Sequence, residues 1–117
     1  MKKVIMLMMV LAAAASAKAI ISTIDAPDTN ISGLAWGDNC LWAMDAVTDF
    51  VYQLDPATGA VQNSFYFPHA TNIVPTGLAY SDNLDMLYLG GWYSTTGYVY
   101  KYTTAGAYQG MVDMCGG

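Results

Sequence analysis

The sequence predicts an all-β fold made of two repeated antiparallel units, and three observations lead to this prediction. Short apolar runs separated by turn residues extend over residues 33–67, and the same arrangement returns over about 77–112. Outside the N-terminal apolar segment no run has helical periodicity, whereas Phe50, Tyr52 and Leu54 share one face at a period of two residues. All fifteen aromatic residues (three Phe, three Trp and nine Tyr) lie within the repeated region, where they suit half-buried strands.

The two copies match segment by segment. Gly33-Leu34-Ala35-Trp36 returns as Gly77-Leu78-Ala79-Tyr80, Leu41-Trp42 as Leu87-Tyr88, Val51-Tyr52-Gln53-Leu54 as Val99-Tyr100-Lys101-Tyr102, and Thr58-Gly59-Ala60-Val61 as Ala105-Gly106-Ala107-Tyr108. The offsets run from 44 to 48 residues, close to the length of a four-stranded β-propeller blade. We therefore expect one blade at 31–68, and a connector followed by a second blade at 69–117.

Each unit is expected to contain four strands joined by hairpins. The expected strands lie at about 32–36, 40–45, 50–55 and 60–67 in the first unit, and at about 76–80, 86–90, 97–103 and 107–112 in the second. Residues 37–39 form the first hairpin turn. In the turn at 55–59, Pro56 presets φ and Gly59 accepts the left-handed conformation. Residues 91–96 are expected to form a longer loop between the second and third strands of the second unit.

The first 17 residues have the pattern of a secretory signal peptide. Lys2 and Lys3 precede a 14-residue apolar run that ends in small residues at 15–17. The run is shorter than the roughly 20 residues that a membrane span needs. We expect cleavage after Ala17, or two residues later, and a secreted or periplasmic product. Residues 18–30 then supply an N-terminal outer strand, at 20–24, and a polar connector.

Three segments of the first unit carry a resemblance to a known family. The residues at 33–36 (Gly-Leu-Ala-Trp), 41–45 and 51–59 are similar to the blade repeats of NHL-like and YncE-like β-propellers, and the similarity covers nearly all of the chain after the signal peptide. The second unit departs from it, with Gly91 in place of Asp45 and Thr104 in place of Pro56. The resemblance implies blade structure and leaves function open, because one repeat serves enzymes, binding modules and scaffolds.

The charge balance excludes one class of partner. After signal cleavage two lysines remain against nine aspartates, with no arginine or glutamate, so the net charge is about −7. Nucleic acid is not expected as a partner, because its binding needs lysine or arginine to neutralise phosphates. Anionic membrane surfaces are disfavoured for the same reason. The acidity also has a simple interpretation, which is that it keeps an aromatic-rich exported protein soluble.

Trp92, Tyr93 and Tyr98 are the candidate ligand-binding residues, because amphipathic aromatic side chains near a loop can stack on a sugar or a peptide. The alternative is that they pack between blades. Asp45 and Asp49, which flank a tight loop, are the candidate metal ligands.

A further acidic cluster lies at 82–85, and the oxygen atoms of either group could in principle bind calcium. Neither group has the spacing of a known calcium loop, and aspartate also favours turns for its own hydrogen bonds. We expect no cofactor.

The single histidine, His69, lies in the connector between the units and is expected to be a solvent-exposed loop residue. We also expect no disulfide between Cys40 and Cys115, because blade topology places them at opposite rims, beyond the roughly 7 Å that a disulfide spans. Whether either cysteine pairs between chains stays open.

The first functional expectation is an exported binding or scaffold module, because no phosphate loop, nucleophile elbow or zinc-protease motif is present. One alternative is implied by the resemblance: a propeller enzyme of the lactone-hydrolase or glutaminyl-cyclase type, acting through residues around a central channel. The first strands of the units are expected to line that channel, and Tyr80 is their only ionisable side chain. The sequence therefore favours a protein that is not an enzyme.

The number of blades is the remaining question, because propellers have four to eight blades and this sequence encodes two. We expect the sequence to be the N-terminal part of a longer propeller. In many propellers the N-terminal strand completes the last blade, but in a two-blade chain both blades already have four strands, so the strand at 20–24 has no blade to complete. The alternative is a self-assembling two-blade protein that binds a carbohydrate or a peptide. Its open apolar faces would promote association and close a ring with an even number of blades. Ligand, oligomeric state and total blade number stay open.

Overall fold

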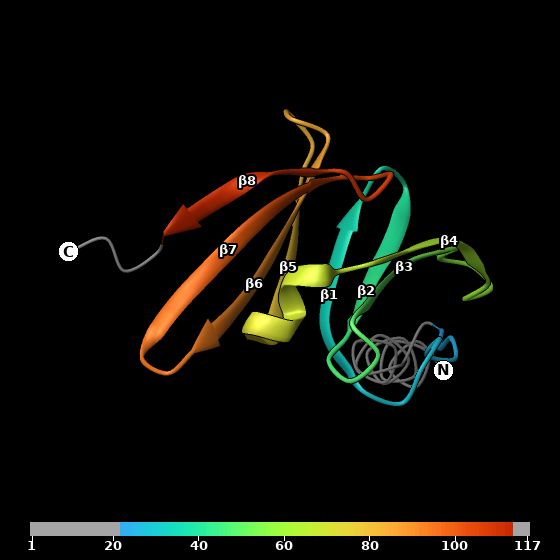
Figure 1. Cartoon of the computed structure of the whole chain (residues 1–117). Helices are drawn as coiled ribbons and strands as arrows, with labels where there is room; N and C mark the ends of the chain where they lie inside the picture. Colours follow the sequence, from blue (N-terminus) through green and yellow to red (C-terminus); the bar gives the residue numbers. More distant parts are fainter. Residues whose placement is uncertain (1–21, 114–117) are drawn as a thin grey trace, which may run out of the picture.

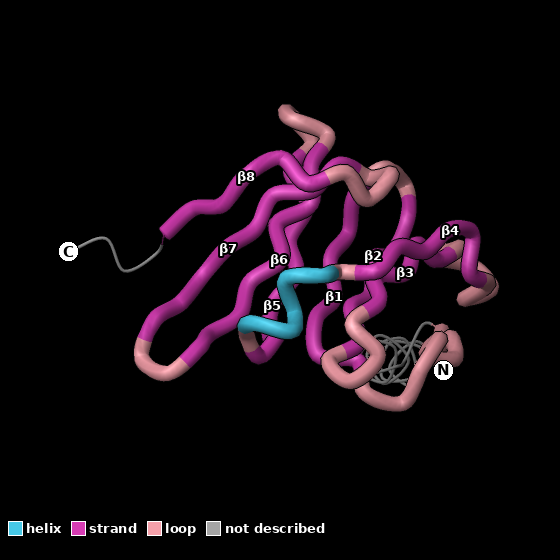
Figure 2. Tube along the Cα trace, in the orientation of Figure 1, coloured by secondary structure: helices cyan, strands magenta, loops and turns pink. Residues whose placement is uncertain are grey.

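The computed structural model describes residues 22–113, so the expected signal peptide and Cys115 lie outside the described residues. The first sheet consists of β1 (Ile31–Gly37), β2 (Cys40–Asp45), β3 (Phe50–Leu54) and β4 (Val61–Tyr66), and the second of β5 (Val74–Ser81), β6 (Met86–Tyr93), β7 (Thr96–Thr103) and β8 (Tyr108–Asp113). Each sheet is an antiparallel meander with its strands side by side in chain order (Figures 1 and 2). The predicted all-β fold with two antiparallel four-stranded units is confirmed.

The predicted strand bounds agree with the structure to within two residues except at the end of β6. The longer loop expected at 91–96 is wrong, because β6 and β7 continue to a two-residue turn in which Ser94 takes a φ of 57°. Tyr98 pairs with Gly91, and Trp92 pairs with Gly97. Each aromatic side chain therefore faces a glycine across the hairpin, and the two strands can pair without crowding.

Two turns form as their residues predict. Asp38 and Asn39 both have a φ of 54°, the left-handed pair that a two-residue hairpin requires. In the second turn, Asp55 Oδ1 accepts hydrogen bonds from the backbone N–H groups of Ala57 (2.8 Å) and Thr58 (3.0 Å), and Gly59 has a φ of 76°. Side-chain hydrogen bonds to the local backbone fix this turn.

The segments outside the sheets differ from expectation. The part of the expected N-terminal strand that the structure describes, 22–24, belongs to no strand. The connector between the sheets contains a short 3₁₀ helix, η1 (Pro68–Asn72), which starts at a proline as helices commonly do (Figure 2). Among the residues that the structure describes, no helix is long and apolar enough to cross a membrane.

The core lies between the two sheets and under η1. Its fully or nearly buried members come from β2, β3, β6, β7 and the connector: Trp42, Met44, Val51, Phe67, Ala70, Ile73, Leu87, Leu89, Tyr100 and Tyr102. The sheets approach most closely where β1 meets β5. A Cβ at Gly33 would lie 3.0 Å from the backbone N of Leu78, and a Cβ at Gly37 would overlap the ring of Tyr80. The absence of side chains at these two glycines lets β5 pack directly on β1.

Asp45 ties the loop after β2 to the segment before β1. Its side chain is fully buried, and its carboxylate accepts backbone hydrogen bonds from Thr48 (2.7 Å), Val47 (2.8 Å) and Asn30 (3.1 Å). Burial alone raises the pKa of Asp45, but these hydrogen bonds together outweigh burial and hold the pKa below its ordinary value. The buried carboxylate is therefore charged at neutral pH and satisfied by the backbone.

We expect Asp45→Asn to lower the free energy of unfolding by about 2 kcal/mol, because an amide cannot accept all three hydrogen bonds and presents N–H groups to other donors. The folded-state pKa is depressed, so the stabilisation by Asp45 is present above pH 3.8 and is lost as the pH falls through the folded-state pKa. Urea unfolding at pH 7 and pH 3 measures both effects. Asp82→Asn, at an exposed turn, is the control; equal stability of the two variants at pH 7 would contradict the role of Asp45.

Candidate functional site

An aromatic cluster joins the two sheets beside η1. His69 stacks on Tyr100 with ring centroids 4.5 Å apart and an interplanar angle of 21°, and it packs against Tyr108 at the same centroid distance. From the first sheet, Phe65 stacks on Tyr102 at 5.8 Å. These contacts fix η1 over the face of the second sheet that is turned toward the first.

His69 is held by a hydrogen bond as well as by stacking. Its Nδ1 forms a short hydrogen bond with the hydroxyl of Tyr102, a residue that is almost completely buried. Burial lowers the pKa of His69, so the ring is neutral at pH 7. Burial, with smaller contributions from Tyr108 and Tyr100, raises the pKa of Tyr102 to about 12. The Tyr102 hydroxyl therefore stays protonated at neutral pH and can donate a hydrogen bond to Nδ1. The expectation that His69 is a solvent-exposed loop residue is wrong.

A cleft of about 540 Å³ opens next to this cluster, between η1 and the outer strands of the second sheet. We call it the tyrosine cleft, and its lining residues are Thr71, Asn72, Tyr93, Tyr98, Tyr100 and Met111. Tyr93 and Tyr98 lie on the same face of the β6–β7 hairpin, because Tyr98 pairs with Gly91 and Tyr93 with Thr96. Tyr100 forms the buried floor and Tyr93 is largely exposed.

The polar groups of the tyrosine cleft are uncharged. The Thr71 hydroxyl donates to the carbonyl of Pro68 at 3.0 Å and retains its capacity as an acceptor. Within the described part of the chain, the Asn72 amide and the hydroxyls of Tyr93 and Tyr98 make no hydrogen bond to protein. Burial, followed by the neighbouring Tyr108 and Tyr98, raises the pKa of Tyr100, so its hydroxyl also stays protonated. The cleft thus combines flat aromatic surfaces with neutral donors and acceptors.

The structure separates the three candidate ligand-binding residues. Tyr93 and Tyr98 line the tyrosine cleft, whereas Trp92 points to the opposite face of β6, because successive side chains of a strand alternate. Trp92 is 49% exposed there. Tyr100, Asn72, Thr71 and Met111 were not foreseen as site residues. The repeat places Tyr100 on the Tyr98 face, but the contribution of η1 depends on how the connector folds.

The candidate metal ligands have other partners. Both oxygens of Asp45 accept backbone hydrogen bonds, as described above. Burial, and then the charge of Asp45, raise the pKa of Asp49. In the second acidic group, Asp85 accepts a hydrogen bond of 2.6 Å from the Tyr80 hydroxyl, which is the main reason that the pKa of Tyr80 rises to about 12. Within residues 22–113 no three His, Cys, Asp or Glu side chains gather as a metal site would require.

Cys40 is buried and contacts the side-chain amides of two glutamines. Its Sγ accepts a hydrogen bond from Gln53 Nε2 at 3.2 Å and lies 3.3 Å from Gln62 Oε1. The expected separation from Cys115 concerns a residue outside the described range and stays a prediction. No protein-family model matches this chain, and no curated protein sequence is significantly similar to it.

The hydrogen bond between Tyr102 and His69 is expected to stabilise the fold. We expect Tyr102→Phe to lower the free energy of unfolding by about 1 to 2 kcal/mol, because it leaves the half-buried Nδ1 without this partner. Tyr108→Phe is the matched control, since the Tyr108 ring packs on His69 but its hydroxyl makes no hydrogen bond among the described residues. Urea unfolding at pH 7.5 compares the variants, and equal losses in both would contradict the assignment.

The same histidine sets a pH dependence. The folded-state pKa of His69 lies below its ordinary value of 6.5, so its stabilising effect is complete above pH 6.5 and declines as the pH falls from 6.5 toward the folded-state pKa. This window lies above the acidic range in which Asp45 titrates. Unfolding free energies measured between pH 7.5 and pH 5 should fall in the native protein and change much less in His69→Gln.

Proposed function

We propose that the chain is an exported segment of β-propeller type that works as a binding module, with the tyrosine cleft as its ligand site. The repeat length and the order of strands in each sheet support the propeller interpretation. The signal-peptide pattern at 1–17 supports export to the periplasm or the medium. The observation that carries the proposal is the gathering of Tyr93, Tyr98 and Tyr100 beside Asn72 and Thr71 in one uncharged cleft.

A neutral carbohydrate is the ligand that this chemistry favours. Tyrosine offers an apolar ring face for stacking and a hydroxyl for hydrogen bonding, which suits the alternating C–H and O–H surfaces of a sugar. The amide of Asn72 supplies both donors and acceptors. No charged side chain lines the cleft, so neither an anionic nor a cationic ligand would find a counter-charge. A ligand that combines flat apolar faces with many neutral hydroxyls fits these groups best.

An enzymatic role receives less support. Asp45, one of the two candidate metal ligands, is buried and has both oxygens engaged by backbone N–H groups, so it is not free to act in an enzyme of lactone-hydrolase or glutaminyl-cyclase type. Burial, and then the neighbouring tyrosines, raise the pKa of Tyr100 in the tyrosine cleft, and no carboxylate lies among the lining residues. The cleft is therefore suited to binding rather than to acid–base chemistry.

Binding can be tested with a panel of neutral oligosaccharides and isothermal titration calorimetry. We expect Tyr98→Ala to weaken binding at least tenfold, about 1.4 kcal/mol, because it removes the central stacking surface of the cleft. Trp92→Ala is the matched control, since it removes an aromatic side chain from the opposite face of the same hairpin. Circular dichroism confirms that both variants fold. Equal loss in the two variants, or binding of peptides but of no sugar in the panel, would contradict the proposal.

A further inference from the structure

Each sheet has one face that packs on the other sheet and one face that does not. On the first sheet, the register places the following side chains on the face turned away from the second: Leu34, Trp36, Leu41, Ala43 and Leu54. We call this the open face of the first sheet. Leu34 is 59% exposed and Trp36 is 61% exposed. Large apolar side chains exposed side by side mark a surface that associates.

The open face of the first sheet repeats a surface that is already packed within the chain. By the repeat, its five residues correspond in order to residues of the second sheet that face the first: Leu78, Tyr80, Leu87, Leu89 and Tyr102. Leu87, Leu89 and Tyr102 are buried in the core, and Leu78 and Tyr80 pack against it. The first sheet therefore presents outward the same surface that the second sheet uses to dock onto its neighbour.

The complementary surface is also repeated. The first sheet receives Leu78 and Tyr80 on a face that includes Gly33 and Ala35, together with Trp42, Met44 and Val51 from its second and third strands. The corresponding residues of the second sheet point away from the first: Gly77, Ala79, Tyr88, Gly90 and Val99. We call this the open face of the second sheet. Its residues are equivalent to those of the first sheet on which the second sheet packs, but within residues 22–113 no sheet packs on it.

Gly77 gives the most specific evidence for a sheet that packs on this face. At the equivalent Gly33, a Cβ would lie 3.0 Å from the backbone N and 3.1 Å from the Cβ of Leu78. At Gly77 a Cβ would meet nothing within 4 Å, and its φ is not in the left-handed region. The described chain therefore gives no reason for glycine at 77. A leucine approaching from a further sheet, as Leu78 approaches Gly33, would supply one.

We propose that the open face of the second sheet binds the open face of the first sheet of a second copy of this chain, with Leu34 of one copy seated on Gly77 of the other. The contact continues the arrangement found inside the chain, and it joins two different surfaces. Head-to-tail contacts of this kind generate rings when the rotation closes. The assembly then has an even number of sheets.

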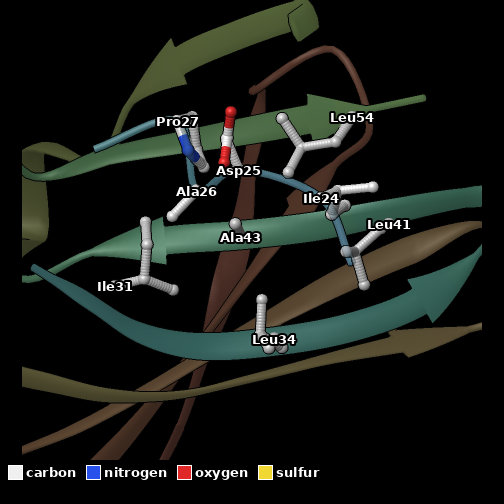
Figure 3. A pocket seen from close by; sticks show the side chains of 9 residues that line it. All are labelled: Ile24, Asp25, Ala26, Pro27, Ile31, Leu34, Leu41, Ala43 and Leu54. Atoms are coloured by element: carbon white, nitrogen blue, oxygen red, sulfur yellow. The ribbon is translucent and has the colours of Figure 1, made fainter. Parts of the chain in front are cut away.

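The N-terminal segment occupies part of the docking position. Residues 24–27 cross the open face of the first sheet near Leu41, Ala43 and Leu54, as Figure 3 shows. Ala43 and Leu54 are buried there, and a cavity of about 350 Å³ with apolar lining remains between the segment and the sheet. In the equivalent contact inside the chain, Trp42, Met44 and Val51 of the first sheet share one buried cluster with Leu87, Leu89 and Tyr102. The second copy displaces the segment and fills the cavity with Tyr88 and Val99.

Two variants with one defect each provide the test. The 117-residue chain is expressed in an exporting host, and the product is analysed by sedimentation velocity over a range of concentrations. The double variant Leu34→Gln/Trp36→Gln removes the apolar docking residues without changing the charge. Gly77→Val fills the receiving position with a side chain for which its own chain has space. We expect the native protein to associate. For each variant alone we expect the dissociation constant of self-association to rise at least tenfold, so that the variant is monomeric at concentrations at which the native protein associates.

Mixing the two variants separates this contact from other modes of association. Each variant keeps the surface that the other lacks, so a one-to-one mixture should form a complex of two chains that grows no further. Gly33→Val is the matched folding control: the same substitution at the equivalent glycine should clash with Leu78 and lower the urea midpoint, whereas Gly77→Val should leave it unchanged. A native protein that is monomeric at all concentrations, a Gly77→Val variant that associates like the native protein, or a mixture that stays monomeric would overturn the proposal. Sugar binding at the tyrosine cleft is unaffected by any of these outcomes.

Discussion

The packing of β5 directly on β1 is the contact on which the rest of the structure depends. Leu78 and Tyr80 reach the first sheet because Gly33 and Gly37 carry no side chain in their path. This close approach of the inner strands sets the two sheets face to face, and the larger side chains of the outer strands then fill the space between them. The connector has to cross from one sheet to the other, and it does so by folding η1 over the aromatic cluster. The tyrosine cleft is a consequence of that crossing.

Most of the fold could be predicted because its determinants are local. Alternating apolar residues define the strands, and Asp38, Asn39 and Gly59 have the residue types that left-handed turn positions require. The repeat adds a second reading of each strand, so that an ambiguous segment in one unit is decided by its partner in the other. All eight strands follow from these signals, although β6 continues beyond its expected end.

The features that could not be predicted depend on contacts between distant residues. The β6–β7 hairpin is longer than expected because glycines face aromatic residues across it, and this pairing becomes visible only once the register is known. His69 looks like a loop residue until η1 places it on Tyr100 and Tyr102. The candidate site was half predicted: Tyr93 and Tyr98 line the cleft, while Trp92 lies on the other face. Trp92 and Tyr93 are adjacent on β6, and adjacent side chains of a strand point to opposite faces. They could form one site together only in the loop expected from the sequence at 91–96.

The face-to-face packing of the sheets is tested most directly by a double-mutant cycle between Gly37 and Tyr80. A methyl group at position 37 would overlap the Tyr80 ring, so Gly37→Ala should lower the free energy of unfolding by about 1 to 3 kcal/mol in the native background. In a Tyr80→Ala background the ring is gone, and the same substitution should cost little. The account predicts a coupling free energy of at least about 1 kcal/mol between the two positions, and strictly additive effects would contradict it.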